Sequence, residues 1–431
     1  MQSKKRFPVI QLSLLLLAIN QTHANDFDAT VSVRSQLSDN SKKTPAAEEP
    51  IEERQDIYRL GLRGSHSNWL IDADVDYQLY AQKFAKHSQE DEEYADGSAN
   101  LVFGKDHNPL GLELSHSRRM LLRSPSDVAL LQNLREREII SAQPILRTRI
   151  SAADWIYVRG RAENVRFIGE DNNQDSKRNG GSIGWAHAIS KTSAINLGGH
   201  YTDISFDQLS ELDYSLAGVN LAYTVKLRNL DYVVDIGYNE TSPEIGEKEG
   251  APTYNFRLGY DTGYHLFEAY AGRQITDTSF GSGNLVRPGE IPGADGFSPD
   301  LGQIDRKTVG LTFSTKVICA RCTFTLGASL TDDDYLEREN DLRNTYYRSR
   351  FAYSISNASR ISLQLDRAEY NQERELLSVD YEVNYLSLEF IHTFVNGFDI
   401  RLFGRTEERT GEQVENNYKE NIVGVGLGFV F

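Results

Sequence analysis

Apolar and polar residues alternate one by one in many short segments of this chain. From 69 to 79 the odd positions hold Trp, Ile, Ala, Val, Tyr and Leu, whereas Asp72, Asp74 and Asp76 occupy even positions. Residues 231–239 repeat the pattern, and 423–431 place Val, Val, Leu, Phe and Phe at odd positions. Alternation with a period of two predicts β-strands that have one apolar face and one polar face.

Short polar connections separate these segments. They are residues 65–68, 105–109, 151–154, 190–193, 226–229, 262–264, 317–322, 357–359 and 394–397. Longer acidic connections such as 90–93, 240–249 and 407–420 fall between them. Short turns that alternate with long loops are typical of outer-membrane β-barrels. With a first strand near 29–33 and a closing strand at the end, the sequence predicts an all-β fold: one large closed antiparallel transmembrane barrel of about 18–20 strands over residues 25–431.

Residues 1–24 have the pattern of a cleavable export signal, with Lys4, Lys5 and Arg6 before an apolar stretch and a small-residue exit. No later run approaches the roughly 18 apolar residues that a membrane-spanning helix requires. Residues 38–56 are expected to form a polar outer loop or a disordered tether. Residues 277–303, rich in Gly and Pro, are expected to form a long loop that acts as a constriction or as an outer lid.

The composition narrows the class of protein. A formal net charge of -16 argues against binding to nucleic acid, which calls for a basic face. The 22 Tyr and 19 Phe residues favour strand-rich structure. Several aromatic residues lie next to predicted short turns, which predicts a girdle at one membrane interface. They are Trp69, Trp155, Phe394, Phe398 and Phe431.

Two segments carry a resemblance to a known family. Residues 114–127, LSHSRRMLLRSPSD, and residues 180–185, GGSIGW, resemble the beta-barrel porin 2 group and the related barrels that accompany exopolysaccharide systems. The alternating C-terminus also resembles the closing strand of outer-membrane barrels, which implies that Phe429 and Phe431 belong to an assembly signal. The resemblance implies a Gram-negative outer-membrane location and a loose link to exopolysaccharide export. It brings no catalytic or binding residues with it.

Charged residues that alternate with the apolar face are expected to line the interior. The candidates for a basic wall are Arg147, Arg149, Arg159, Arg161, Arg348 and Arg350, and those for an acidic wall are Asp72, Asp74 and Asp76. Charges that face each other across a pore favour polar solutes and set ion preference. The alternative is that these charges pair with neighbouring strands and only stabilise the wall.

Other chemistry is sparse. Cys319 and Cys322 fall in a predicted short turn, where a disulfide is expected in an oxidising compartment. The His residues form no cluster with metal-ligand spacing, so neither a metal nor a cofactor is expected. No Gly-x-Ser-x-Gly motif is present, and an enzyme is not expected. A hydrolase whose site combines residues from several strands is left open as the less favoured alternative.

The sequence therefore predicts a porin-like outer-membrane channel for polar solutes. The alternatives are a receptor or adhesin that acts through its loops and a scaffold barrel without an open pore. The expected partners are outer-membrane lipid and lipopolysaccharide, the barrel assembly machinery, and a polysaccharide or oligosaccharide.

Overall fold

The computed structural model describes residues 26–105, 108–123, 127–169, 174–278, 302–336, 341–373 and 379–431. The expected export signal at 1–24 lies outside the described residues, as do positions 279–301 of the long connection expected at 277–303. None of the described helices is long and apolar enough to cross a membrane.

The alternating segments form twenty strands in one sheet. The first ten are β1 (Asp26–Ser38), β2 (Glu53–Ser67), β3 (Ile71–Phe84), β4 (Glu92–Phe103), β5 (Leu110–Leu122), β6 (Leu134–Arg149), β7 (Asp154–Ile168), β8 (Ser176–Ala188), β9 (Ser193–Phe206) and β10 (Tyr214–Lys226). The second ten are β11 (Leu230–Pro243), β12 (Glu249–Asp261), β13 (His265–Asp277), β14 (Gln303–Thr315), β15 (Cys322–Tyr335), β16 (Leu342–Ser354), β17 (Ser359–Gln372), β18 (Val379–Thr393), β19 (Phe398–Gly411) and β20 (Tyr418–Val430).

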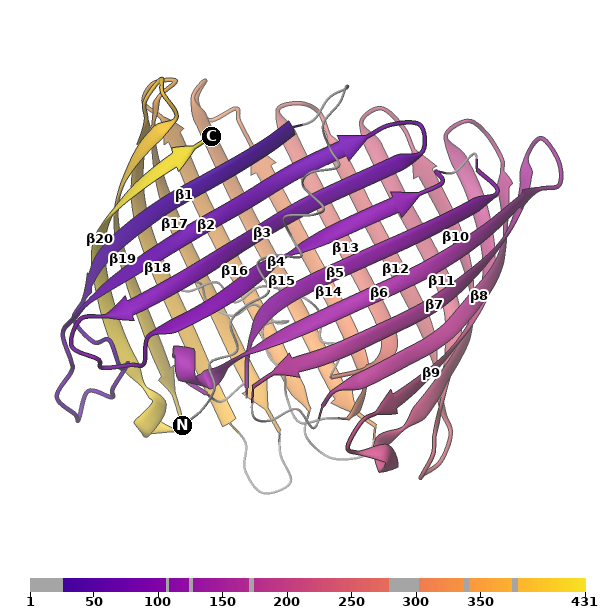
Figure 1. Cartoon of the computed structure of the whole chain (residues 1–431), viewed down its shortest axis with the longest axis horizontal. Coiled ribbons are helices and arrows are strands. Elements are labelled where there is room, and N and C mark those ends of the chain that lie inside the picture. The colour runs from indigo at the N-terminus through magenta and orange to yellow at the C-terminus, as the bar shows by residue number, and fades with distance from the viewer. Residues whose placement is uncertain are drawn as a thin grey trace.

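Each strand pairs antiparallel with its neighbour in sequence, and β20 pairs with β1, so the sheet closes into a barrel. The nine predicted short turns all join an even-numbered strand to the next odd-numbered one. We call the end with these turns the turn end and the opposite end the loop end. The turn end is at the top of Figure 1 and the loop end at the bottom. The predicted fold class is therefore confirmed.

The loop end carries the longer connections and three 3-10 helices among the described residues, η1 (Leu131–Asn133), η2 (Ser210–Leu212) and η3 (Val414–Asn416). Residues 39–52 join β1 to β2 at this end. The expected loop at 38–56 is shorter in the structure because 53–56 already pair with β1 as part of β2.

The two faces of the wall differ in polarity. One face exposes large apolar side chains, each between 42% and 62% exposed: Val31, Leu79, Leu146, Ile183, Val219, Ile236, Leu311, Leu365 and Val425. The other face carries most of the charged residues. From this face, Arg178 on β8 pairs with Asp277 on β13, a strand that is not its neighbour. Side chains of two strands that are not neighbours in a closed barrel can meet only inside it. The face that carries Arg178 is therefore the inner face, and the apolar band is on the outside.

Not all of the expected aromatic girdle faces outward. Phe398 lies opposite Phe429 on the outer face at the turn end, and Phe429 packs edge-on against Phe431. Trp155, however, lies opposite Arg149 on the inner face, and the Arg149 guanidinium sits 5.3 Å from its ring centroid. The expectation for Trp155 was wrong because proximity to a turn does not decide which face a side chain takes.

Two hairpins leave the wall near the loop end. β4 and β5 pair only as far as Gly97 opposite Arg118, although β5 continues to Leu122. β12 and β13 pair only as far as Tyr254 opposite Arg273, although β13 continues to Asp277. Beyond these points both faces of β5 are buried at Met120 (4%), Leu121 (0%) and Leu122 (1%), and the end of β13 is buried at Ile275 (3%), Asp277 (1%) and the adjoining Thr278 (1%). A strand in the wall would expose one face, so the ends of both hairpins bend into the interior.

β5 separates from β4 at a glycine of β4. Gly97 has a φ of +153° at the last paired position, a conformation that side chains disfavour, and a Cβ there would lie 2.3 Å from the carbonyl oxygen of Asp76. Side chains from the hairpin then replace part of the missing ladder. Arg119 pairs with Asp96 at 3.1 Å, and the Glu136 carboxylate accepts a hydrogen bond from the backbone N–H of Ala95. Unpaired strand edges are costly in a buried setting, and these contacts lower that cost.

Candidate functional site in the barrel interior

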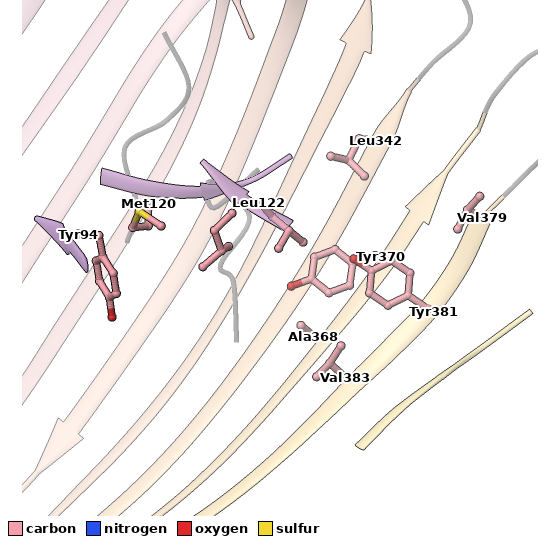
Figure 2. Close-up of a cluster of buried hydrophobic side chains, with 10 residues drawn as sticks. Tyr94, Met120, Leu122, Leu342, Ala368, Tyr370, Val379, Tyr381 and Val383 are labelled. Atoms are coloured by element: carbon pink, nitrogen blue, oxygen red, sulfur yellow. The ribbon is translucent and has the colours of Figure 1, made fainter. Parts of the chain in front are cut away.

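The loop end of the interior is narrowed by an apolar cluster that combines two parts of the wall. It contains Tyr94, Met120, Leu122, Leu134, Leu342, Ala368, Tyr370, Val379, Tyr381 and Val383, each at most 9% exposed. Figure 2 shows Leu122 of the β5–β6 hairpin beside the stacked rings of Tyr370 and Tyr381, from β17 and β18. The hairpin end is therefore packed against the inner face of distant strands, where it narrows the interior.

Buried ion pairs also hold inward-bent segments at the loop end. Arg178 donates to both carboxylate oxygens of Asp277 at 2.9 and 2.7 Å, and the Tyr214 hydroxyl donates to the same carboxylate at 2.5 Å. Arg306 on β14 makes a two-point contact with Asp333 on β15 at 2.6 and 2.7 Å. These contacts fix the end of the β13–β14 hairpin from both sides, and the sequence offered no spacing signal for the contacts that join non-neighbouring strands.

The β1–β2 connection also folds over the interior. Lys43 donates to Glu407 at 2.6 Å and its ammonium lies 5.0 Å from the ring centroid of Tyr418. Glu420, two residues after Tyr418 on the inner face of β20, lies 3.9 Å from the ammonium of Lys43. Because Glu407 and Glu420 are both buried, Lys43 supplies a positive charge that their carboxylates need.

The first part of the predicted basic wall lies on the inner face, but its side chains are mostly engaged. Arg147 donates to the carbonyl of Gly104 at 2.9 Å. Arg149 donates to the carbonyls of Ser151 and Ala152, in its own turn, at 2.9 and 2.6 Å. These two guanidinium groups therefore brace turns at the turn end.

The second part of this wall is on β7. On β7, Tyr157 lies opposite Arg147 and Trp155 lies opposite Arg149, so both share the inner face. Arg159 and Arg161 follow at every second position of β7 and lie on this face as well. Arg161 pairs with Glu163 at 2.8 Å. Its charge is therefore offset within its own strand.

The predicted acidic wall lies on the inner face of β3, opposite β2. Asp72 pairs with Lys105 at 2.6 Å, and Asp76 lies 3.8 Å from Arg63. Asp74 is exposed toward the interior. Two of the three carboxylates expected to form the acidic wall are therefore near a cationic partner. The role of these residues in ion preference stays a prediction.

The predicted pair on β16 also lies on the inner face, since Tyr347 and Tyr353 on alternate positions are exposed on the outer band. Arg348 pairs with Asp366 at 3.2 Å. Arg350 is exposed, and no ion pair or hydrogen bond involves it within the described part of the chain. Arg350 is therefore available to a solute.

Three further arginines lie on the inner face of the strands near the barrel closure. Arg401 and Arg405 alternate with Ile400 and Leu402, which predicts their inward position from the sequence, whereas Arg34 was not singled out. Arg34 on β1 and Arg401 on β19 both face Gly426 of β20, one from each side, and Arg405 follows on β19. Arg34 lies 4.8 Å from the ring centroid of Phe403, and Arg401 pairs with Asp399 at 2.8 Å. The period-two pattern of β1 could have revealed Arg34, but only barrel closure brings it beside β19.

The remaining predicted residues lie at the turn end. Cys319 and Cys322 form a disulfide in the turn between β14 and β15. The backbone N–H of Phe431 donates to the carbonyl of Ala29 at 2.8 Å, which extends the closing pair of strands. No group of three or more His, Cys, Asp or Glu residues in the described ranges could hold a metal ion.

No family model matches the chain, and no curated protein matches its sequence. Solved structures of β-barrels do match. The FrpB iron transporter from Neisseria meningitidis is 9% identical, with a TM-score of 0.47 over 97% of this chain and 83% of that one. OpdQ of Pseudomonas aeruginosa is 13% identical, with a TM-score of 0.42 over 95% of this chain and 100% of that one. Likenesses this distant carry no information about a solute, and nothing in them supports the exopolysaccharide link.

Proposed function

We propose that this protein is an outer-membrane channel through which polar solutes pass. The observation that carries the proposal is the contrast between the two faces of one closed wall. The outer face is a band of exposed apolar side chains, whereas the inner face of the same strands carries exposed charged residues such as Asp74 and Arg350. Only a barrel that sits in lipid and encloses water gives a favourable environment to both faces.

The size of the barrel supports this proposal. Closed barrels of eight strands are filled by their own side chains, while those with roughly 16 or more strands leave an aqueous interior or a plugged lumen. With twenty strands, the wall is too wide for its inward side chains alone to fill it. The inward hairpins narrow this interior at the loop end and leave the charged wall toward the turn end accessible.

The location, partners and solute are part of the same proposal. The apolar band would contact outer-membrane lipid, lipopolysaccharide would surround the loop end, and the barrel assembly machinery would insert the chain. An acidic or neutral oligosaccharide, in line with the resemblance to barrels of exopolysaccharide systems, is the solute that we favour. Catalysis is not part of the proposal.

The packed loop end favours a second candidate function. The apolar cluster and the buried ion pairs bring the two hairpins and distant strands together, which suits a barrel that is closed at rest. In that case the protein would act through its loops as a receptor or scaffold, or would open only when a partner binds.

Conductance of the refolded chain in planar bilayers tests the proposed function. Large, steady current steps that oligosaccharides reduce are expected for a channel. A correctly folded barrel that passes no current, also under high voltage, would overturn the proposal and favour the closed receptor or scaffold. Folding can be verified independently by the heat-dependent shift in electrophoretic mobility that closed barrels show.

A further inference from the structure

We propose that the inner face of β16–β20 and β1 is a binding site for an acidic sugar, a hydroxylated ring that bears a carboxylate. This inference rests on the proposed function, because it names the solute class that the channel would admit. The site, which we call the arginine patch, consists of Arg34, Arg350, Arg401 and Arg405 and the inward residues between them.

The strand register places these side chains in two rows across the wall, with the row of Phe403 between them. In one row, Arg350 pairs with Gln364, Gln364 with Ser387, and Ser387 with Arg405. In the next row but one along the strands, Arg401 and Arg34 flank Gly426. Since neighbouring strands lie roughly 4.8 Å apart, Arg350 and Arg405 are separated by about 14 Å of wall. The amide of Gln364 and the hydroxyl of Ser387 thus form a polar floor, by which we mean the stretch of wall between the guanidinium groups of Arg350 and Arg405.

The glycines of β20 make room for this arrangement. A Cβ at Gly424 would lie 2.3 Å from the ring of Phe403, so the ring lies flat across the backbone of β20. Arg34 stacks on this ring, at 4.8 Å from its centroid. A Cβ at Gly428 would lie 2.4 Å from the carboxylate of Asp399, which in turn holds Arg401. The glycines that alternate with the apolar residues of β20 therefore position two guanidinium groups of the arginine patch.

The patch carries more positive charge than its own residues offset. Arg405 and Arg401 both repel the Arg34 guanidinium, and Glu389 attracts it. Within the described ranges, Arg34, Arg350 and Arg405 have no carboxylate within the 4.0 Å of an ion pair. Like charges held together without partners are unfavourable, and an anion between them relieves the repulsion. By contrast, Arg147 and Arg149 already donate to backbone carbonyls.

The chemistry of the patch selects the ligand class. A guanidinium fork matches the two oxygens of a carboxylate, which explains a preference for acidic groups. Gln364 and Ser387, between the arginines, offer an amide and a hydroxyl that can bond to ring hydroxyl groups. A simple inorganic anion would satisfy the charges but would leave this polar floor unused.

Calorimetric titration of the refolded full chain in detergent at low salt tests the site, with trigalacturonate as the acidic probe. Maltotriose is the neutral counterpart, and inorganic phosphate is the simple anion. We expect trigalacturonate to bind, maltotriose not to bind, and phosphate to bind at least about tenfold more weakly. The R34Q/R405Q variant should weaken trigalacturonate binding by about tenfold or more, because each lost contact is charge-assisted.

The matched control is R147Q/R149Q, which removes the same charge from inner-face arginines that have carbonyl partners, and should change affinity by less than about twofold. A charge-retaining R34K/R405K variant, which lacks the fork, should lie between wild type and R34Q/R405Q. Equal losses in the two Gln variants, equal binding of phosphate, or no binding of trigalacturonate would overturn the site. The two proposals can fail separately, because binding does not require conduction. A protein that conducts but does not bind trigalacturonate would contradict only the proposed binding site. A protein that binds trigalacturonate but passes no current would contradict only the proposed channel.

Discussion

At the scale of single residues, charges on the inner wall differ mainly in what partners them. Arg149 is held by carbonyls of its own turn, and Arg178 is held by a buried carboxylate. Arg34 and Arg405 have no carboxylate partner among the described residues. A polar solute interacts best with charges that have no carboxylate partner, such as Arg34 and Arg405. Arg149 and Arg178 would have to give up an existing contact before they could bind a solute.

The buried pair between β8 and β13 should dominate local stability. Asp277→Asn leaves Arg178 without its counter-charge in a site where both side chains are at most 7% exposed, and a loss of about 3 kcal/mol is expected. Urea unfolding in lipid vesicles measures this loss. Asp207→Asn is the control: it removes the half-exposed partner of Lys177, which lies next to Arg178 on β8, and should cost less than about 1 kcal/mol. Equal losses would contradict the assignment of a buried pair.

The close approach at Gly424 predicts a second asymmetry. Gly424→Ala pushes the Phe403 ring off the wall, and overpacking of this kind costs about 1–3 kcal/mol. Gly426→Ala should be nearly neutral, since its Cβ would meet no atom nearer than 3.5 Å. The same unfolding assay compares the two variants. If Gly426→Ala destabilises as much as Gly424→Ala, the general loss of glycine, and not the ring, is the cause.

At the scale of elements, the two inward hairpins are held differently from the rest of the wall. Elsewhere a continuous ladder of backbone hydrogen bonds fixes each strand. The ends of β5 and β13 have lost that ladder on one side, and side-chain contacts keep them in the interior. Contacts of this kind open at a lower free-energy cost than a barrel strand, so these hairpins are the elements best suited to move.

Loosening the β5–β6 hairpin should therefore change conduction. Leu122→Ala removes a fully buried contact with the loop-end cluster, at a local cost of about 2–5 kcal/mol, and is expected to raise single-channel conductance or the frequency of transitions between levels. Leu146→Ala removes the same atoms from the outer face of β6, where the side chain is 52% exposed, and should leave the current traces unchanged. Identical traces from Leu122→Ala and wild type would show that the hairpin does not limit conduction.

At the scale of the whole molecule, one closed sheet separates an apolar outer face from a charged inner face. In the proposed function, the outer band would keep apolar groups in contact with lipid, and the inner face would keep charges in contact with water. Barrel closure by β1 and β20 removes the strand edges that lipid could not satisfy. The same closure brings the first strand of the barrel to the last, which creates the arginine patch.

The two faces should respond oppositely to added charge. Leu311→Arg places a guanidinium in the outer band, where a cost of about 2–4 kcal/mol is expected near the membrane midplane. Thr312→Arg places it one residue further along β14, on the inner face opposite Glu268, and should cost little. Folding efficiency and urea unfolding in lipid vesicles distinguish the two. Similar losses would mean that β14 does not separate lipid from water.

The sequence by itself determined the strands, their turns and their alternation, because a period of two and short polar connections are local properties of the chain. It therefore predicted the closed barrel and the nine short turns. It did not decide where β5 and β13 leave their neighbours. The run Met120, Leu121 and Leu122 breaks the alternation at the end of β5, but a local break does not show which neighbouring strand has been lost. It also could not show that Arg149 is engaged by its own turn whereas Arg34 meets Arg401 and Arg405. Partnership between charges depends on register and closure, and only the tertiary structure sets these.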